Sequence, residues 1–158
     1  MASSCLRSSI RAIVPGVSTT APNSRGAKGA VRYLHPDTLR LVGDFTGGGS
    51  YVAARYVFPT PLSPTAVAFR AKSASKGLDV RFVDSDGQTH QHYITLSGNA
   101  EEFQDILLPT AGSPKHHWGG RNDGVLRPPV RTVILSVHAA VLPEKKGHVD
   151  FSNIRFFT

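Results

Sequence analysis

The sequence predicts a single all-β domain, built as a sandwich or a barrel. Three observations favour this class. Short apolar runs recur between turn signals, few segments have the period of an amphipathic helix, and the 158 residues include 15 glycines and 11 prolines. An apolar content of 40% is sufficient for a hydrophobic core. The chain length corresponds to one domain with a tail.

The clearest predicted element is a β-hairpin between Leu78 and Ile94. Apolar and polar residues alternate from 78 to 82, which is the period of a half-buried strand. Asp86-Gly87 then provides turn chemistry, because glycine adopts the positive φ that a tight turn needs. This hairpin indicates a binding surface more than a reaction centre, because its return strand is polar. One side of that strand carries His90, His92 and Ile94, and the other carries Thr89, Gln91 and Tyr93.

The remaining strands are predicted from the same signals. Folded structure is expected to begin near Val31 or Thr38. Residues 115–129 form the longest predicted loop and contain the only tryptophan, Trp118. The prolines at 59, 61 and 64 are expected to end one strand, because proline cannot donate to a sheet ladder. Strands are expected over 38–45, 51–58, 67–72, 103–108, 131–138 and 147–157.

Residues 1–30 are expected to form a disordered tail, separate from a folded domain over 31–158. The segment is rich in Ser, Arg, Ala and Gly and contains no acidic residue. Organellar transit peptides share this composition, and it suits a linker beside an excised module equally well. Pro15 interrupts the apolar stretch at 12–14, so a secretory signal is not indicated.

The net charge of +7 does not by itself indicate a nucleic-acid-binding protein. Five of the eighteen basic residues precede the first acid, Asp37, and the others are scattered apart from Lys145-Lys146. The single cysteine, Cys5, excludes an internal disulfide and a cysteine-ligated zinc site. No apolar run approaches membrane-spanning length. We therefore expect neither nucleic acid nor a membrane as a partner.

The sequence contains no catalytic signature. The glycines at 47–49 do not make a phosphate loop, since no Lys-Ser/Thr pair follows them. Nucleophile-elbow and dinucleotide-binding motifs are also missing. The acids Asp79, Asp84, Asp86 and Asp123 mostly fall at turns or strand edges, whereas paired-carboxylate catalysis needs two acids in one cleft. An enzymatic role is an alternative that no motif supports.

Three segments together resemble a known family. They are DFTGGGSYVAARY over 44–56, VDSDGQTHQ over 83–91 and HWGGRNDGVLRPPVR over 117–131. With the closing strand, their order is similar to that in the galactose-binding-like β-sandwich modules of glycoside hydrolases and other polysaccharide-active proteins. The resemblance implies a jelly-roll of two antiparallel sheets that binds a polysaccharide or oligosaccharide without cleaving it. It also implies an accessory module of a larger protein, at the cell surface or outside the cell.

The same resemblance bears on cofactors. Many such modules have two adjacent aspartates in the last strand, one of which holds a structural calcium. Here the matching positions are Ser152-Asn153, so the pattern requires no cofactor. Calcium needs several oxygen ligands, and the candidates that this sequence offers are Asp44 and Asp150.

Sugar binding needs flat aromatic faces against the sugar ring and hydrogen-bonding groups for its hydroxyls, and the candidates divide between two sites. One site uses the outward face of the hairpin, and the other uses the long loop at the end of the sandwich. We favour the end site because it contains the only indole, although Trp118 can alternatively plug the core. The Asn122-Asp123-Gly124 run can equally be a turn. The sheet-face candidates are Arg81, Gln91 and Tyr93; the end candidates are Trp118, Asn122, Asp123 and Tyr51; Gln88 is a further hydrogen-bonding candidate.

The seven histidines raise a second class of function, a metal-dependent enzyme on a jelly-roll. His90 and His92 share a strand face, and His116-His117 can approach from the loop as ligands of a transition metal. No cysteine or nearby carboxylate accompanies them, so imidazoles packed on the sheet or exposed to solvent are the favoured interpretation. A third alternative is an organellar assembly subunit with this fold, for which residues 1–30 would be the targeting peptide.

Overall fold

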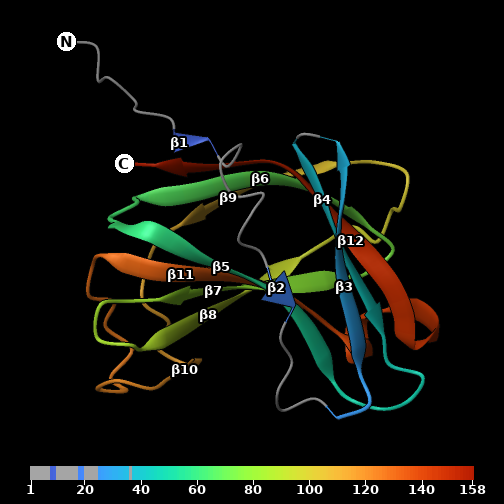
Figure 1. Cartoon of the computed structure of the whole chain (residues 1–158), viewed down its shortest axis with the longest axis horizontal. Helices are drawn as coiled ribbons and strands as arrows, with labels where there is room; N and C mark the ends of the chain where they lie inside the picture. The colour runs from blue at the N-terminus through green and yellow to red at the C-terminus, as the bar shows by residue number, and fades with distance from the viewer. Residues whose placement is uncertain (1–7, 10–17, 20–24, 36) are drawn as a thin grey trace.

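The computed structural model describes residues 8–9, 18–19, 25–35 and 37–158. They form two antiparallel sheets packed face to face, which confirms the predicted β-sandwich (Figure 1). Two short 3₁₀ helices, Ala139–Val141 and Pro143–Lys145, precede the last strand. The strands are β1 (Ser8–Ser9), β2 (Ser18–Thr19), β3 (Lys28–His35), β4 (Thr38–Asp44), β5 (Tyr51–Leu62), β6 (Ala66–Ser73), β7 (Gly77–Val83), β8 (Thr89–Thr95), β9 (Gln104–Pro109), β10 (His117–Trp118), β11 (Val130–His138) and β12 (Lys146–Phe157).

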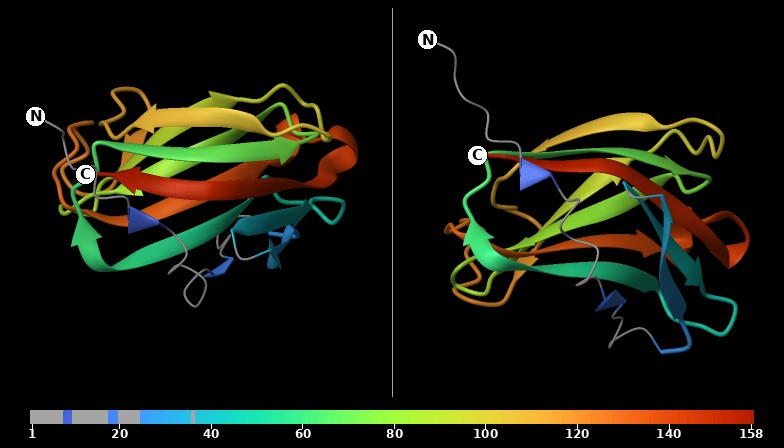
Figure 2. Two further views of the ribbon diagram at one scale, coloured as in Figure 1. Left: turned by 90° about the horizontal axis from the view of Figure 1, so that it is seen from above. Right: turned by 45° about the horizontal axis from the view of Figure 1, so that its top comes forward.

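The chain crosses repeatedly between the two sheets. Sheet A has the order β3-β4-β12-β6-β9, with β1 beside β12, and sheet B has the order β10-β8-β7-β11-β5-β2. Among the described strands of sheet B, β7 and β8 are the pair that forms a hairpin, and it is the hairpin that the sequence predicts. Figure 2 shows the two layers from other directions, with β12 inside one layer and β11 inside the other.

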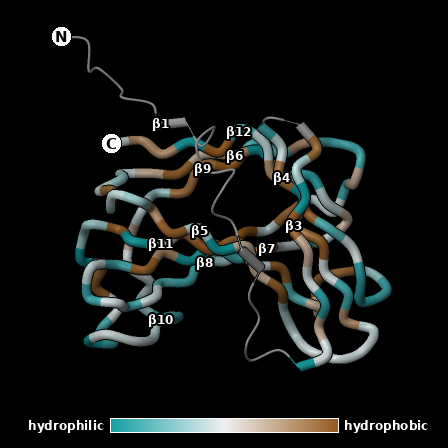
Figure 3. The backbone as a smooth tube through the Cα atoms, in the orientation of Figure 1, coloured by the Kyte–Doolittle hydropathy of each residue, from teal (hydrophilic) through white to brown (hydrophobic). Residues whose placement is uncertain are grey.

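The core lies between the sheets and follows the alternation of each strand. Leu41 of β4, Phe69 of β6 and Phe151 of β12 point inward from sheet A, and each is at most 1% exposed. Val80 and Phe82 of β7 face them from sheet B and are fully buried. Figure 3 shows hydrophobic residues along the strands of both layers. Burying each of these side chains stabilises the fold by about 1.5–3 kcal/mol.

Strand β5 runs further than the sequence predicts. It continues through Pro59 and Pro61 to Leu62, whereas the prolines were expected to end it after Phe58. The partner strand β11 shifts register between Val130 and Thr132, opposite this part of β5. A proline is tolerated at such an irregularity because its missing N–H removes no regular ladder bond there.

The predicted tail lies largely outside the described residues, which omit 1–7, 10–17 and 20–24. Its described parts pair with the sandwich: β1 lies antiparallel to β12, and β2 lies antiparallel to β5. Strand β3 begins at Lys28, three residues before the expected start of the folded domain. Within the described ranges, no helix has the length and apolar character to cross a bilayer.

Candidate functional site

The outward side of sheet B carries the largest group of candidate residues. The registers of β5, β11, β7 and β8 place Arg55, Ile134, Arg81 and Gln91 in one row across four strands. The edge strand β10 adds Trp118, which lies opposite Thr89 of β8. We use the name aromatic face for the residues that gather on this side: Tyr51, Arg81, Gln91, Tyr93 and Trp118.

Arg81 is at the centre of the aromatic face. Its Nε donates a 2.7 Å hydrogen bond to Oε1 of Gln91, its cross-strand partner. The guanidinium carbon lies 5.1 Å from the ring centroid of Tyr51 and 5.3 Å from that of Trp118. Cation–π contacts of this kind contribute about 0.5–1 kcal/mol each at exposed sites. Arg81 therefore connects two rings that come from strands far apart in the sheet order.

Tyr93 lies across the neighbouring strand instead of pointing into solvent. A Cβ built on Gly77 of β7 would come within 2.1 Å of the Tyr93 hydroxyl oxygen. Gly77 thus leaves the room in which the phenol ring rests on the sheet. Tyr93 is still 56% exposed and Trp118 is 44% exposed, so both rings have surface available to a ligand.

A histidine–aspartate pair lies at one end of this surface. Asp79 is 2% exposed, and its carboxylate accepts a hydrogen bond from Nε2 of His138, which comes from β11. The ring of Tyr51 packs against the imidazole with a centroid separation of 5.9 Å. The position of Tyr51 is therefore fixed by His138 on one side and by Arg81 on the other.

The loop that carries Trp118 is packed on the turn of the central hairpin. The carbonyl oxygen of His116 accepts a 2.9 Å hydrogen bond from the Gln91 N–H, which joins the loop to β8. Gly119 and Gly120 follow Trp118 with φ of 78° and 51°. A Cβ on Gly120 would lie 2.5 Å from a carboxylate oxygen of Asp86, so only glycine permits this approach.

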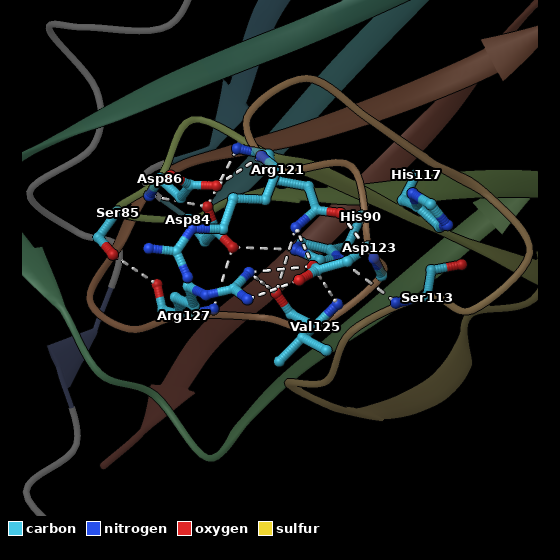
Figure 4. A network of polar contacts seen from close by, with 12 residues as sticks. Asp84, Ser85, Asp86, His90, Ser113, His117, Arg121, Asp123, Val125 and Arg127 are labelled. Atoms are coloured by element: carbon cyan, nitrogen blue, oxygen red, sulfur yellow. Dashed lines mark hydrogen bonds and ion pairs between the residues drawn. The ribbon is translucent and has the colours of Figure 1, made fainter.

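A buried carboxylate holds the turn and the loop together (Figure 4). Asp84 is fully buried and accepts four hydrogen bonds, from the backbone N–H groups of Asp86, Gln88 and Arg127 and from Nε2 of His90. Burial raises its pKa, but these hydrogen bonds outweigh burial, and the pKa of Asp84 lies below its ordinary value. Asp84 therefore stays ionised inside the protein.

His90 continues this network to the other side of the loop. Its Nδ1 accepts a hydrogen bond of 3.3 Å from the backbone N–H of Ser113, while Nε2 lies 3.1 Å from Asp84 Oδ2. The network assigns the proton to Nε2, because a neutral imidazole must accept at one nitrogen and donate at the other. His90 thus connects the hairpin turn to residue 113, where the long loop begins.

A second set of contacts closes the far part of the loop. The buried amide of Gln88 donates to Asp123 Oδ1 and to the Val125 carbonyl, and it accepts from the Gly124 N–H at 2.7 Å. Asp123 also forms a two-bond ion pair with Arg127 at 2.6 and 3.0 Å. The hydrogen bonds from Arg127 and Gln88 hold the pKa of Asp123 well below its usual range.

The structure therefore divides the candidate residues differently from the two sites that the sequence suggested. Trp118 and Tyr51, expected at the end of the sandwich, lie on the same face as Arg81, Gln91 and Tyr93. The polar atoms of Gln88 and Asp123 are engaged within the loop, and the Asn122 side-chain oxygen lies 2.7 Å from Nδ1 of His117. Gln88 contacts the loop that positions Trp118, and Asn122 and Asp123 are part of that loop.

The candidate metal ligands are spread over separate environments. His90 is buried against Asp84, His92 lies 2.8 Å from the Ala111 carbonyl oxygen, and His116 is exposed. Among the described residues, no group of three or more His, Cys, Asp or Glu side chains is placed to hold a metal ion.

The two calcium candidates are also separated. Asp150 forms a two-bond ion pair with Arg40 at 2.7 and 3.0 Å. Asp44 accepts two hydrogen bonds from Thr46, which lower the pKa of this carboxyl. Asp150 lies opposite Arg40 of β4, and Asp44 lies four residues further along that strand. The carboxylates of Asp44 and Asp150 are therefore separated by about 13 Å along the strand direction. They do not converge on one site.

Sequence reasoning missed the pairs Asp84–His90 and Asp79–His138. The Asp84–His90 pair could have been inferred from the sequence, because hairpin pairing places Phe82 opposite His90 and therefore brings Asp84 near the same end of the strand. The second depends on β11 lying next to β7, which no local pattern indicates.

Comparisons with known proteins give matches at the level of structure. No family model matches the chain, and no curated protein matches it by sequence. The family 11 carbohydrate-binding module of the cellulosomal cellulase Lic26A-Cel5E of Clostridium thermocellum is similar with a TM-score of 0.67 and 13% identity, over 99% of this chain and 95% of that one. A family 29 carbohydrate-binding module variant in complex with mannohexaose has a TM-score of 0.57 and 10% identity, over 90% and 92% of the two chains.

A third similar structure is the agarase AgWH50C, with a TM-score of 0.53 and 17% identity over 90% of this chain. The match covers 24% of the agarase, so this chain spans about a quarter of that protein. Together these structures confirm that the fold is the β-sandwich that the sequence resemblance implied.

Proposed function

We propose that this domain, which has the β-sandwich fold found in carbohydrate-binding modules, is itself a non-catalytic carbohydrate-binding module. The observation that carries the proposal is the aromatic face. Tyr93 and Trp118 expose large fractions of their rings on one side of sheet B, beside the hydrogen-bonding groups of Arg81 and Gln91. Flat aromatic surfaces next to oriented polar groups are the combination that a sugar ring needs.

The arrangement suits a chain-like ligand better than a single sugar. Tyr93 lies over β7 and Trp118 lies at the β10 edge, so the two exposed rings are separate platforms on one open surface. An oligosaccharide can stack one residue on each platform while its hydroxyl groups meet the side chains between them. The loop contacts of Gln88, Asn122 and Asp123 support this function indirectly, because they hold the segment that presents Trp118.

The biological setting is part of the same proposal. One similar structure is a module of a cellulase, and another is an agarase of which the match covers about a quarter. By analogy, this domain keeps a polysaccharide-active protein on its glycan, at the cell surface or outside the cell. The binding is expected to need no cofactor.

A glycan panel tests the proposal. The full-length chain is applied to immobilised neutral and acidic polysaccharides, with and without EDTA, and bound protein is quantified. We expect saturable binding to at least one glycan, unchanged by the chelator. Absence of binding to every glycan contradicts the proposed function, and binding that EDTA abolishes contradicts the claim that no metal is needed.

Gly77→Ala is expected to weaken binding without unfolding the protein. The new methyl group would occupy the position of the Tyr93 hydroxyl, and the phenol ring would have to swing away from the sheet. Gly77 sits in a strand with ordinary extended φ, where alanine is favoured over glycine by roughly 0.5–1 kcal/mol, so stability should change by no more than about 1 kcal/mol. Thermal melts and glycan-binding curves measure the two effects. Unchanged binding would show that Tyr93 does not need to lie flat.

A further inference from the structure

The charges on the outward side of sheet B, around the aromatic face, are unevenly balanced. The outward side chains of β5, β7, β8 and β11 include two arginines, Arg55 and Arg81, in the same cross-strand row. In these four described strands, Asp79 is the one carboxylate on this side. It is 2% exposed and its oxygen is engaged by His138. A ligand on this surface therefore meets two cations and no accessible anion from these strands.

The guanidinium of Arg81 is held ready to bind an anion. Nε is fixed by the 2.7 Å bond to Gln91, and the group is in contact with the rings of Tyr51 and Trp118. Its two terminal nitrogens have no hydrogen-bond partner among the described residues. A planar guanidinium presents parallel N–H groups that match a carboxylate or a sulfate, and little entropy is lost when the group is already oriented.

The hydrogen-bonding capacity of the face also favours an anionic ligand. A sugar hydroxyl both donates and accepts, so a neutral glycan needs acceptors on the protein as well as donors. Here the carboxylate is occupied, and the carbonyl oxygen of Gln91 already accepts from Arg81. The charged side chains that remain are donors without a counterion. An acidic group on the ligand would satisfy them, whereas a neutral hydroxyl would leave the arginine charges unpaired.

We propose that the aromatic face selects acidic glycans, in which a uronate carboxylate or a sulfate ester pairs with Arg81 while sugar rings stack on Trp118 and Tyr93. This inference rests on the proposed carbohydrate-binding function and adds the class of its ligand. Arg55, about 10 Å away across two strand spacings, provides a second cation for an acidic group further along the chain.

Two matched pairs of soluble polymers test the inference by affinity electrophoresis and titration calorimetry at 0.05 and 0.15 M salt. Polygalacturonate is compared with its fully methyl-esterified form, and dextran sulfate is compared with dextran. We expect the acidic member of at least one pair to bind about tenfold more tightly or better, which corresponds to one charge-assisted pairing. The pair that discriminates identifies carboxylate or sulfate as the preferred group.

Variants separate a specific site from general attraction by a basic protein. Arg81→Gln should remove most of the preference for the acidic polymer, and Arg81→Lys should restore it only in part, because lysine lacks the planar fork. Arg32→Gln is the matched control: it removes one exposed positive charge from β3, on sheet A. Arg55→Gln, at an exposed position, gives an independent reading if the Arg81 variants do not fold.

The outcomes are distinguishable. Equal or tighter binding of the neutral polymers would overturn the acidic preference and leave the proposed function intact. Failure to bind any polymer, in this assay or on the glycan panel, would overturn both. An equal loss of the preference for the acidic polymer in Arg32→Gln and Arg81→Gln would assign the effect to net charge and overturn the inference.

Discussion

Replacing Trp118 by alanine should weaken glycan binding roughly tenfold, the size of effect expected for the loss of an aromatic anchor of an interface. The ring is 44% exposed and contacts the Arg81 guanidinium, so its loss removes a stacking platform and also one of two aromatic contacts that orient the arginine. The fold should persist, because Trp118 contributes little buried surface to the core. Titration calorimetry and far-UV circular dichroism measure the two properties on the same sample.

Tyr33→Ala is the matched control for this experiment. Tyr33 is an aromatic residue of β3 with 43% exposure, on the other sheet, and its removal should leave binding unchanged. Tyr93→Ala should weaken binding to a degree similar to Trp118→Ala if both rings are platforms. Loss of binding in the Tyr93 variant alone would contradict a role for Trp118 and restrict the site to the β7–β8 surface.

Asp84→Asn should have the largest effect on stability, about 3 kcal/mol of the free energy of unfolding. Each carboxylate oxygen accepts two hydrogen bonds, and every donor pair includes at least one backbone N–H. An asparagine amide must direct its NH₂ group at one of these pairs, which leaves buried donors facing donors. A tautomer change of His90 cannot resolve the conflict, because Nδ1 must keep accepting from Ser113. Thermal or urea unfolding measures the loss, expected as about 10 °C in Tm.

Asp86→Asn is the control on the same turn. Its carboxylate accepts one bond of 2.7 Å from the Arg121 N–H and is only partly buried, so a loss of about 1 kcal/mol or less is expected.

The pH dependence of stability is a second test of the role of Asp84. Because the folded pKa of Asp84 is lowered, its contribution is present above the unfolded value of about 3.9 and is lost as the pH falls through the folded value. The difference between wild type and Asp84→Asn should therefore shrink below about pH 4. Equal stability of wild type and Asp84→Asn at pH 7 would contradict the role of Asp84.

The sequence predicts the strands well where local signals are strong. Alternation and the Asp86-Gly87 turn locate the β7–β8 hairpin, and the apolar positions of β11 identify a core strand. These signals act between near neighbours, so they also give the side of each strand that faces the core. They predict β5 less well, because Pro59 indicates the end of a strand unless the register shift in the partner strand β11 is known.

The candidate site is less predictable because it depends on contacts between distant strands. Arg81, Tyr51 and Trp118 belong to three strands, and only the order β10-β8-β7-β11-β5 brings them to one surface. Trp118 was assigned to an end loop, since two residues are too few to give a strand signal, yet pairing with β8 turns its side chain onto the sheet. Similarly, Gln88 reads as a polar surface residue, and only the loop that covers it explains its burial.

The position of β12 has a consequence for how the protein acquires its fold. This strand is the last in chain order, but it lies in the interior of sheet A, hydrogen-bonded to β4 on one side and to β6 on the other. Until residues through Phe157 have left the ribosome, β4 and β6 have an open space between them, and their inward residues lack Phe151 and Phe156 as partners. Sheet A is therefore completed only after synthesis of the whole domain, and pairings between distant segments close slowly. The nascent chain exposes two unpaired strand edges during that interval, and such edges favour pairing with other chains before the sandwich is complete.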